Sequence, residues 1–566
     1  MQLAHLGWAL IALLALPSSC GEKSTSPSQA AIAAMSLKRG LLITCGRSDS
    51  QFGSVTFEVS CGKEAKADFN LGVKLLHSFE YDEAEKVFAK IINSNPTCAM
   101  AYWGVAMANF HPLWTPPSEP ELTKGLQAIR IAQAITGKSA RKSAYIEAIS
   151  AFYNNWEKVD HRSRCIGFQK AMQEVHIQYP TDVEASIFYA LSLNAAADPA
   201  DKSFTNQRKA GDLLNSLYPN EPNHPGIIHY LIHTYDYPEL AALALPAAKK
   251  YASVAPSSAH ALHMPSHIFT RLGLWADCIR SNQASVEAAQ CYAAEAGIKG
   301  HWDEELHGLD YLMYAHLQRG DNVRAKQLWN YVATIDKVEP TNFKVAYAFA
   351  AIPSRYLMEN RLWGKAAALP ISKKNIAWDT FQWQKAILHF TRFMGTIHLH
   401  DVKSAKVELG QLHQIHENLL AQKDTYKANQ VQIQIGTAQA WLLLAEGHPR
   451  AALLAMNAAA DLEDLTEKHP VTPGEVIPTR ELAGDMLLHL NEPRQALVAY
   501  EANLKKHPNR FNGLYGAGLA AEKSGNLEKA ALYYRQLLLV VNLTHSDRSE
   551  LRAVKRFLKL ETGKSA

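Results

Sequence analysis

Two histidine pairs recur at a fixed distance in this 566-residue chain. His229 and His233 are followed 34 residues later by His263 and His267. A 34-residue period is typical of helix–turn–helix units that stack into a solenoid. Within each pair the spacing is i, i+4, which places both side chains on one helical face. The sequence therefore predicts an all-α chain of antiparallel helix pairs in which these four imidazoles converge on one patch.

Both ends of the chain carry the alternation of small and large residues that such helix pairs need. Near the N-terminus Gly72 precedes Phe88, and near the C-terminus Ala483 and Ala517 stand 34 residues apart in equivalent units. Small residues let two helices approach closely, and helical hydrophobic periodicity continues between these ends. We predict one continuous right-handed helical-repeat array over residues 63–566.

Longer stretches carry a resemblance to a known family. They are CAMAYWGVAM from Cys98, HPLW from His111, HPGIIHYLIHTYD from His224, HALHMPSHIFTRLGLW from His260, ELHGLDYL from Glu305 and EDLTEKHPVTPGEVIPTREL from Glu463. The chain resembles a widespread group of uncharacterised bacterial tetratricopeptide-repeat (TPR) proteins. This resemblance implies a TPR-like α-solenoid. It brings no established activity, so it assigns no catalytic residue.

The N-terminus indicates export. Residues 1–20 contain an apolar run followed by small residues, which is typical of a signal peptide and too short for a membrane-spanning helix. Cys20 precedes a polar tail, as at the start of a bacterial lipoprotein, and a cleaved signal or a buried helix are the alternatives. Residues 21–62 are predicted to be a linker or leader. We expect a periplasmic protein or one anchored to the membrane through a lipidated Cys20.

Cysteine positions fit an oxidising compartment. Cys61 lies before the first helix of the first predicted hairpin and Cys98 lies after its second helix, so both are at the same end of the unit. A Cys61–Cys98 disulfide is one interpretation, and two small buried residues are the other. No CxxC or CxxCH motif is present, which removes support for redox chemistry or haem attachment.

The charge balance excludes two classes of partner. The formal net charge is +4, from 58 basic and 54 acidic residues, and these residues are scattered along the chain. This balance gives no basic patch for nucleic acid or for an anionic membrane surface. Membrane contact is expected only through the predicted lipid anchor.

The repeat positions of His229, His233, His263 and His267 place them on the concave wall of the solenoid. Neutral imidazoles from neighbouring helices can share a transition metal such as Zn, Cu or Fe. A second interpretation makes the same rings a polar groove wall or helix-packing residues, and Pro265 is expected to disturb the second helix. Residues expected to support the cluster are His260, Asp236, His307 and Asp310.

Two functions follow from these alternatives. The first is an exported scaffold whose concave groove binds a peptide or protein partner, and the second is a metal-binding protein or metal-dependent enzyme with a His-lined site. No acid, base or nucleophile is recognisable from spacing, so the scaffold is the preferred prediction. The run EKHPVTPGEVIP is interpreted as an ordered connector between repeats.

Overall fold

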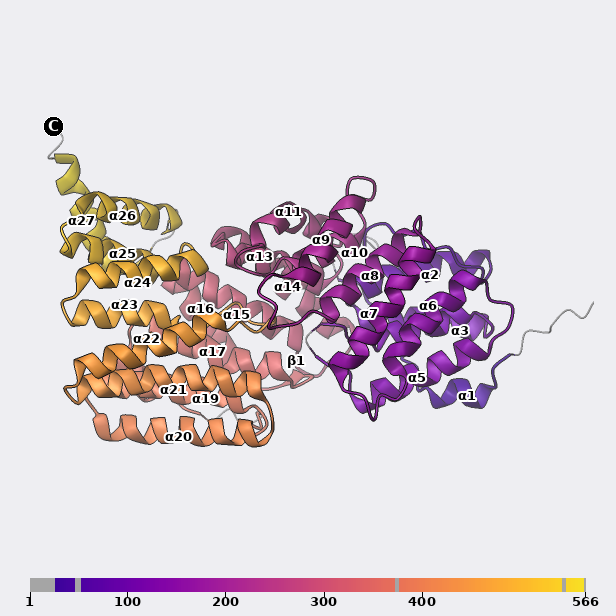
Figure 1. Cartoon of the computed structure of the whole chain (residues 1–566), viewed down its shortest axis with the longest axis horizontal. Coiled ribbons are helices and arrows are strands. Elements are labelled where there is room, and N and C mark those ends of the chain that lie inside the picture. The colour runs from indigo at the N-terminus through magenta and orange to yellow at the C-terminus, as the bar shows by residue number, and fades with distance from the viewer. Residues whose placement is uncertain (1–25, 46–51, 114, 372–375, 542–545, 564–566) are drawn as a thin grey trace, which may run out of the picture.

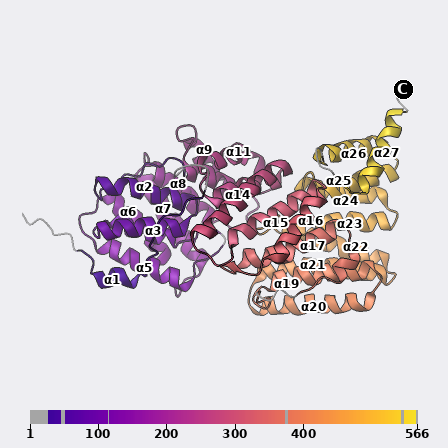
Figure 2. The same cartoon turned by 180° about the vertical axis from the view of Figure 1, so that it is seen from behind.

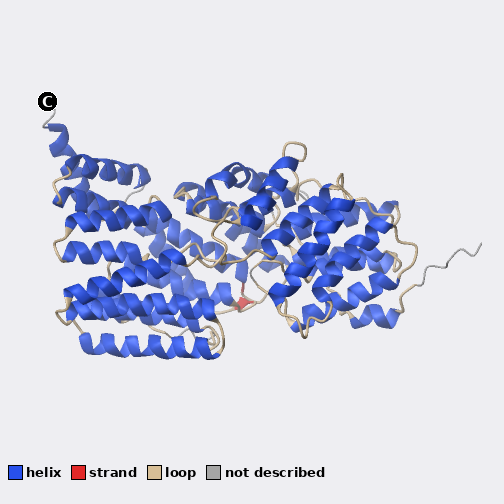
Figure 3. Ribbon diagram, viewed as in Figure 1, coloured by secondary structure: helices blue, strands red, loops and turns tan. Residues whose placement is uncertain are grey.

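A computed structural model describes residues 26–45, 52–113, 115–371, 376–541 and 546–563. The predicted signal peptide, residues 1–20 with Cys20, lies outside the described residues. Helices dominate the described chain, which confirms the all-α prediction (Figure 3). The strands of the described part form a two-residue parallel pair, β1 (His301–Trp302) and β2 (Val338–Glu339).

The molecule is elongated, and its two lobes follow each other along the chain (Figures 1 and 2). We call α1–α14 the N-terminal lobe and α15–α27 the C-terminal lobe. The helices of the N-terminal lobe are α1 (Gln29–Ala34), α2 (Lys63–His77), α3 (Tyr81–Ser94), α4 (Ala99–Ala108), α5 (Glu119–Ala134), α6 (Ala140–Tyr153), α7 (His161–Gln178), α8 (Val183–Ala195), α9 (Thr205–Leu217), α10 (Pro225–Thr234), η1 (Ala241–Ala244), α11 (Leu245–Val254), α12 (Ala259–His263), α13 (Pro265–Arg271) and α14 (Trp275–Glu295).

The C-terminal lobe continues the same succession of neighbouring antiparallel helices. Its helices are α15 (Asp303–Gln318), α16 (Asn322–Thr334), α17 (Phe343–Glu359), α18 (Trp363–Ala367), α19 (Gln382–His398), α20 (Val402–Ala421), α21 (Thr425–Ala445), α22 (Pro449–Leu465), α23 (Thr479–His489), α24 (Pro493–Lys506), α25 (Phe511–Lys523), α26 (Leu527–Val541) and α27 (Glu550–Gly563).

Close contacts between small and aromatic residues hold the helix pairs together. A Cβ atom added to Gly72 of α2 would lie 2.6 Å from the Phe88 ring of α3. The same relation recurs in the C-terminal lobe, where a Cβ on Gly484 would lie 2.7 Å from the Tyr500 ring. Only glycine lets the paired helix approach this closely, because any side chain would collide with the ring. The small–large pattern in the sequence therefore has a steric cause.

The two lobes share a helix. One extended hydrophobic core takes Val345 and Ile352 from α17, and a second takes Tyr347 and Ala350 from the same helix. The second core then continues to Phe557 in α27. Opposite faces of α17 thus pack into different cores, and the helical stack passes from one lobe to the other without a linker.

The predicted leader packs against the N-terminal lobe. Phe52 and Phe57 are buried in its core, and the backbone N–H of Ser54 donates to the carbonyl oxygen of Asn223 at 3.0 Å. Gly53 has a φ of +76°, and a Cβ there would lie 2.5 Å from the Asn223 oxygen. The described part of residues 21–62 is therefore a folded strap, which its weak sequence periodicity did not indicate.

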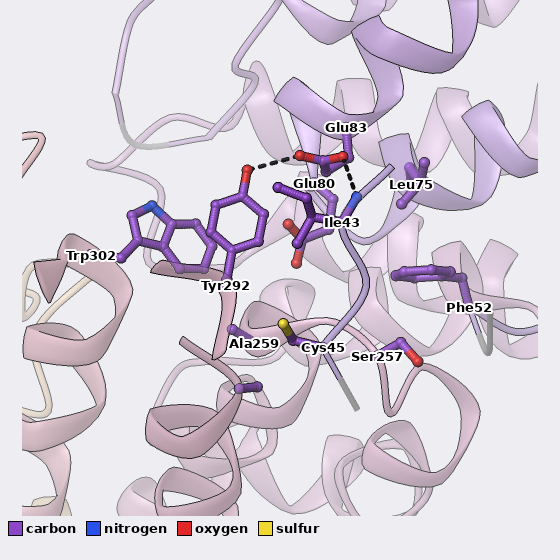
Figure 4. A pocket seen from close by; sticks show the side chains of 11 residues that line it. Ile43, Cys45, Phe52, Leu75, Glu80, Glu83, Ser257, Ala259, Tyr292 and Trp302 are labelled. Carbon is purple, nitrogen blue, oxygen red and sulfur yellow. Dashed lines mark hydrogen bonds between the residues drawn. The ribbon is translucent and has the colours of Figure 1, made fainter. Parts of the chain in front are cut away.

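Two disulfides fix this strap and the first hairpin. Cys61 and Cys98 are bonded, with their Cα atoms 5.3 Å apart, and Cys45 is bonded to Cys291 of α14. Beside the second bond lies a pocket of about 260 Å³ (Figure 4). There the Glu83 carboxylate accepts from the Tyr292 hydroxyl at 2.8 Å and from the Ile43 N–H at 3.0 Å. The strap is thus held by covalent and polar contacts.

The C-terminal lobe also contacts the middle of the chain. The indole N–H of Trp275 donates to the carbonyl oxygen of Asn509 at 2.7 Å. Arg510 is fully buried and donates to Glu359, Glu481 and the hydroxyl of Tyr314 at 2.6, 2.9 and 2.9 Å. This guanidinium ties together α15, α17 and α23 at the start of α25.

Within the described part of the chain, no helix combines the length and the apolar character needed to cross a membrane.

Candidate metal centre

Four helices bring the predicted histidines together between the two lobes. His229 and His233 lie on α10, and His307 lies on α15. His260 and His263 lie on α12, which ends just before Pro265, and α13 then carries His267. The expected disturbance at Pro265 thus divides this segment into two short helices. Both His pairs nevertheless keep their side chains on one side, facing their partner in the pair.

The first group consists of His229, His233 and His260. The Nε2 atoms of His229 and His233 are 2.9 Å apart. One nitrogen from each of the three rings lies within 4.8 Å of the others, which is close enough to share an ion. The Phe79 ring stacks on both His233 and His260, at centroid distances of 5.5 and 5.6 Å. This group, which we call triad A, therefore has an apolar wall.

The second group consists of His263, His267 and His307. The Nε2 atoms of His263 and His267 are 3.1 Å apart, and the His263 and His307 ring centroids are 4.1 Å apart. One nitrogen from each ring again lies within 4.8 Å of the others. We call this group triad B. The His233 and His267 ring centroids are 6.3 Å apart, so the two triads are neighbours.

Hydrogen bonds fix the tautomers of three of these rings. His229 Nδ1 lies 2.6 Å from the His77 carbonyl oxygen, and His267 Nδ1 lies 3.0 Å from an Asp236 carboxylate oxygen. His263 Nδ1 lies 2.6 Å from Asn282 Oδ1, whose amide nitrogen is committed to a backbone carbonyl. Because all three oxygens accept, each Nδ1 carries the proton and each Nε2 presents a lone pair.

Triad B therefore brings two lone pairs face to face. The Nε2 atoms of His263 and His267 are both acceptors when the rings are neutral, and they stand 3.1 Å apart. The Tyr311 hydroxyl lies 3.4 Å from His267 Nε2, too far for a strong hydrogen bond. A shared proton or a cation between the nitrogens would remove the repulsion. This geometry is that of paired metal ligands whose other nitrogen is held by an outer acceptor.

Burial keeps the rings neutral. Both His229 and His263 are 0% exposed. Burial lowers the pKa of His229 to about 3, although the hydrogen bond to the His77 carbonyl opposes this shift. Burial also lowers the pKa of His263, and neighbouring His267 acts in the same direction. Neutral imidazole is the form that binds metal, so no proton has to be displaced near pH 7.

Asp236 orients triad B. Its carboxylate accepts from His267 Nδ1 and from the Arg271 guanidinium at 2.9 Å, and also from Lys468 Nζ at 3.1 Å. Burial alone would raise the pKa of Asp236, but Lys468 and Arg271 hold it well below its usual value. The carboxylate is therefore ionised and available to fix the His267 ring. This is the supporting role expected for Asp236.

Lys468 was missed by the sequence analysis. It belongs to the run EKHPVTPGEVIP, interpreted as a connector, and reaches Asp236 across 232 residues of chain. Burial, followed by the effect of Arg271, lowers the pKa of Lys468 to about 8. Pro470 and Val471 of the same run line a pocket against the triads. The connector is thus part of the candidate site, and no local spacing could have indicated this.

The pocket touches both triads. It has a volume of about 270 Å³ and is lined by His260 of triad A, His267 and His307 of triad B, and Glu304, Lys344, Met264, Pro470 and Val471. Lys344 forms ion pairs with Glu304 and, at 2.7 Å, with Asp303. The Oε2 atom of Glu304 is buried and has no hydrogen-bond partner among the described residues. Polar groups therefore converge where a small ligand could enter.

Two expectations about this region are wrong. Asp310 does not support the His cluster: it forms a buried ion pair with Arg355, and burial raises its pKa to about 6 despite that pair. The fully buried Arg355 needs a carboxylate partner, which explains the displacement. The rings of His229 and His263 also do not form an open groove wall, since no peptide on the outside of the stack can touch fully buried side chains.

A third polar cluster is already saturated. Glu184 accepts from His77 Nε2 and His224 Nε2, both at 2.9 Å. The remaining nitrogen of His77 contacts the Tyr230 hydroxyl at 2.9 Å, and that of His224 accepts from the Gly226 N–H, capping α10. Because each ring nitrogen has a partner, this cluster is a structural network that orients the start of α10.

These features define an all-α helical-repeat protein with a buried cluster of six histidines. Residues 482–541 match the model of the tetratricopeptide repeat. The match covers the units predicted from Ala483 and Ala517, and the chain therefore carries TPR units. TPR proteins are commonly interaction scaffolds, and the repeats support this general class of function.

Solved structures with similarity over most of the chain include the human IFIT1 dimer with m7Gppp-AAAA. The identity is 10% and the TM-score 0.36, over 83% of this chain and 95% of that one. Naa15/Naa10 bound to HypK-THB has 12% identity and a TM-score of 0.22, over 84% and 71%. The P58(IPK) TPR domain has 11% identity and a TM-score of 0.18, over 88% and 99%. No curated protein matches the sequence.

Proposed function

We propose that the chain is a metal-binding TPR protein that holds a transition-metal ion at His263, His267 and His307. The single observation that carries this proposal is the pair of facing Nε2 lone pairs in triad B, 3.1 Å apart. Three neutral nitrogen donors suit Zn, Cu, Ni or Fe. The outer contacts of His267 with Asp236 and of His263 with Asn282 supply the orientation that ligating histidines usually receive.

Alternative explanations for triad B account for less. A structural network would satisfy both nitrogens of each ring, as the cluster around Glu184 does. In triad B the two Nε2 atoms have each other and the distant Tyr311 hydroxyl. A proton shared between the rings would place a cation beside Arg271 and Lys468, whose positive charges oppose it.

Metal analysis of the purified protein tests this proposal. We expect at least one transition-metal ion per chain, and loss of that ion in a His263→Ala, His267→Ala variant. The control is His413→Ala, which changes an exposed histidine of α20. Circular dichroism should give the same helix content for all three proteins. The proposal is wrong if the parent, offered Zn, Cu, Ni and Fe in turn, retains none.

A scaffold function is the second candidate, favoured by the TPR match at residues 482–541. Apolar side chains are exposed along the second helices of successive C-terminal hairpins: Leu454 on α22, Val498 on α24 and Leu539 on α26. They suit a protein or peptide partner, in the groove or on this surface. Crosslinking in intact cells should join these helices to one protein, and crosslinks scattered over unrelated proteins would contradict the idea.

We also propose that the protein is exported, either to the periplasm or to a membrane anchored through Cys20. The two disulfides, Cys45–Cys291 and Cys61–Cys98, support an oxidising compartment. Cell fractionation and mass measurement of the mature N-terminus test this proposal. A chain that keeps its first twenty residues and stays in the cytoplasm would contradict it.

A further inference from the structure

Triad A has the same donor geometry as triad B, and we propose that the two triads together hold a pair of copper ions. This inference rests on the proposed metal-binding function and adds the number and identity of the ions. In triad A, His229 presents its Nε2 lone pair to His233 at 2.9 Å, and a nitrogen of His260 lies within 4.8 Å of both. The carbonyl oxygen of His77 holds the His229 ring from behind.

The two sites are adjacent and related by the repeat. His229 and His233 correspond to His263 and His267 one unit later, so each triad takes an i, i+4 pair from one repeat. The third ligand comes from the following element, His260 for triad A and His307 for triad B. One 34-residue step therefore generates two equivalent three-nitrogen sites, with the His233 and His267 centroids 6.3 Å apart.

The charges around the cluster select the ion. All six ligands are neutral, and the one carboxylate bonded to a ligand, Asp236, is already shared by Arg271 and Lys468. A buried ion of charge +2 receives little compensation here, and the cost of burying charge rises steeply with its magnitude. Cu(I) carries a single charge and is satisfied by two or three nitrogen donors. Two Zn ions would place four positive charges in the same volume.

The pocket connects the two sites. His260 belongs to triad A, His267 and His307 belong to triad B, and all three line the same hollow. A small ligand that enters this pocket therefore reaches both ions. Phe79 stacks on triad A from another side and keeps it apolar.

Anaerobic titration with Cu(I) tests the inference. We expect two copper ions per chain in the parent, one in His233→Ala and one in His263→Ala, and none in the double variant. The control His413→Ala should bind two. Bound copper is measured by elemental analysis after gel filtration, and helix content by circular dichroism confirms that each variant is folded. Crystals of the loaded parent should give two anomalous peaks at the copper edge, one beside each triad.

The outcomes separate this inference from the proposed function. One ion per chain, lost in His263→Ala but kept in His233→Ala, would overturn the copper pair and leave a single metal site in triad B. Two Zn ions that an excess of Cu(I) fails to displace would overturn the choice of copper. No bound ion in the parent would overturn both proposals.

Discussion

Asp236 shows how a residue that binds no metal can control one. It accepts from His267 Nδ1 at 3.0 Å and so fixes both the tautomer and the orientation of that ring. Outer hydrogen-bond partners of this kind commonly contribute tenfold to hundredfold to metal affinity. Its neighbours Arg271 and Lys468 depend on the same carboxylate, which makes Asp236 the centre of a small charged network.

We expect Asp236→Asn to weaken metal binding by about 10- to 100-fold, because the amide cannot hold His267 in the same state. Competition with a chromophoric chelator measures the affinity. The control Asp198→Asn removes an exposed carboxylate paired with Arg162 and should leave affinity unchanged. Equal affinity of Asp236→Asn and the parent would show that His267 is not a ligand.

His469 makes the protein sensitive to acid. Its Nδ1 accepts from the Val471 N–H at 3.2 Å and its ring stacks on Phe343, while burial, followed by the charge of Lys468, lowers its pKa to about 3. The unfolded chain binds this proton near pH 6.5, so between pH 6.5 and 3 protonation favours unfolding. Stability is present above pH 6.5 and is lost as the pH falls.

At pH 5 this one residue should cost about 2 kcal/mol of stability relative to pH 7. We expect His469→Gln, whose amide oxygen can accept the same hydrogen bond, to lose less stability on acidification than the parent. Thermal unfolding of the metal-free proteins at pH 7 and pH 5 gives the comparison. The assignment fails if both proteins lose the same amount.

Individual elements account for what could be predicted and what could not. The histidine quartet was predictable because i, i+4 spacing and a 34-residue period are local regularities. The Gly72–Phe88 contact was predictable for the same reason. Lys468 and the strap around Gly53 were not, because their partners Asp236 and Asn223 are remote in sequence. Asp310 was misassigned because its partner Arg355 lies on a different helix.

The disulfide of the first hairpin closes a loop with a sequence separation of 37 residues. Loop-closure entropy assigns such a crosslink about 4 kcal/mol. We expect a Cys61→Ala, Cys98→Ala variant to unfold at lower denaturant concentration than the parent under oxidising conditions. With a reducing agent present the two proteins should unfold together. A difference that persists after reduction would mean that packing, and not the bond, is responsible.

At the scale of the whole molecule, buried charges hold the stack together. Arg510 is completely buried and neutralises Glu359 and Glu481, which come from different helices of the C-terminal lobe. Its third contact, to Tyr314 of α15, reaches toward the N-terminal lobe. Removing one partner of such a network leaves uncompensated charge in the interior, which costs more than the pair contributes in isolation.

Arg510→Met should therefore lower the free energy of unfolding by about 3–5 kcal/mol. The matched control is Arg361→Met, since Arg361 pairs with Asp485 at the surface with 47% of its side chain exposed. That change should cost less than about 1 kcal/mol. Denaturant unfolding followed by circular dichroism measures both. Similar losses in the two variants would contradict a special role for the buried network.

The contact between Lys468 and Asp236 joins segments from both lobes. A nascent polypeptide consequently lacks the finished ion-binding geometry until residue 468 has been synthesised and folded back. If the chain crosses a membrane unfolded, it acquires its copper from the compartment where it folds, and the ions it carries become a record of where maturation took place.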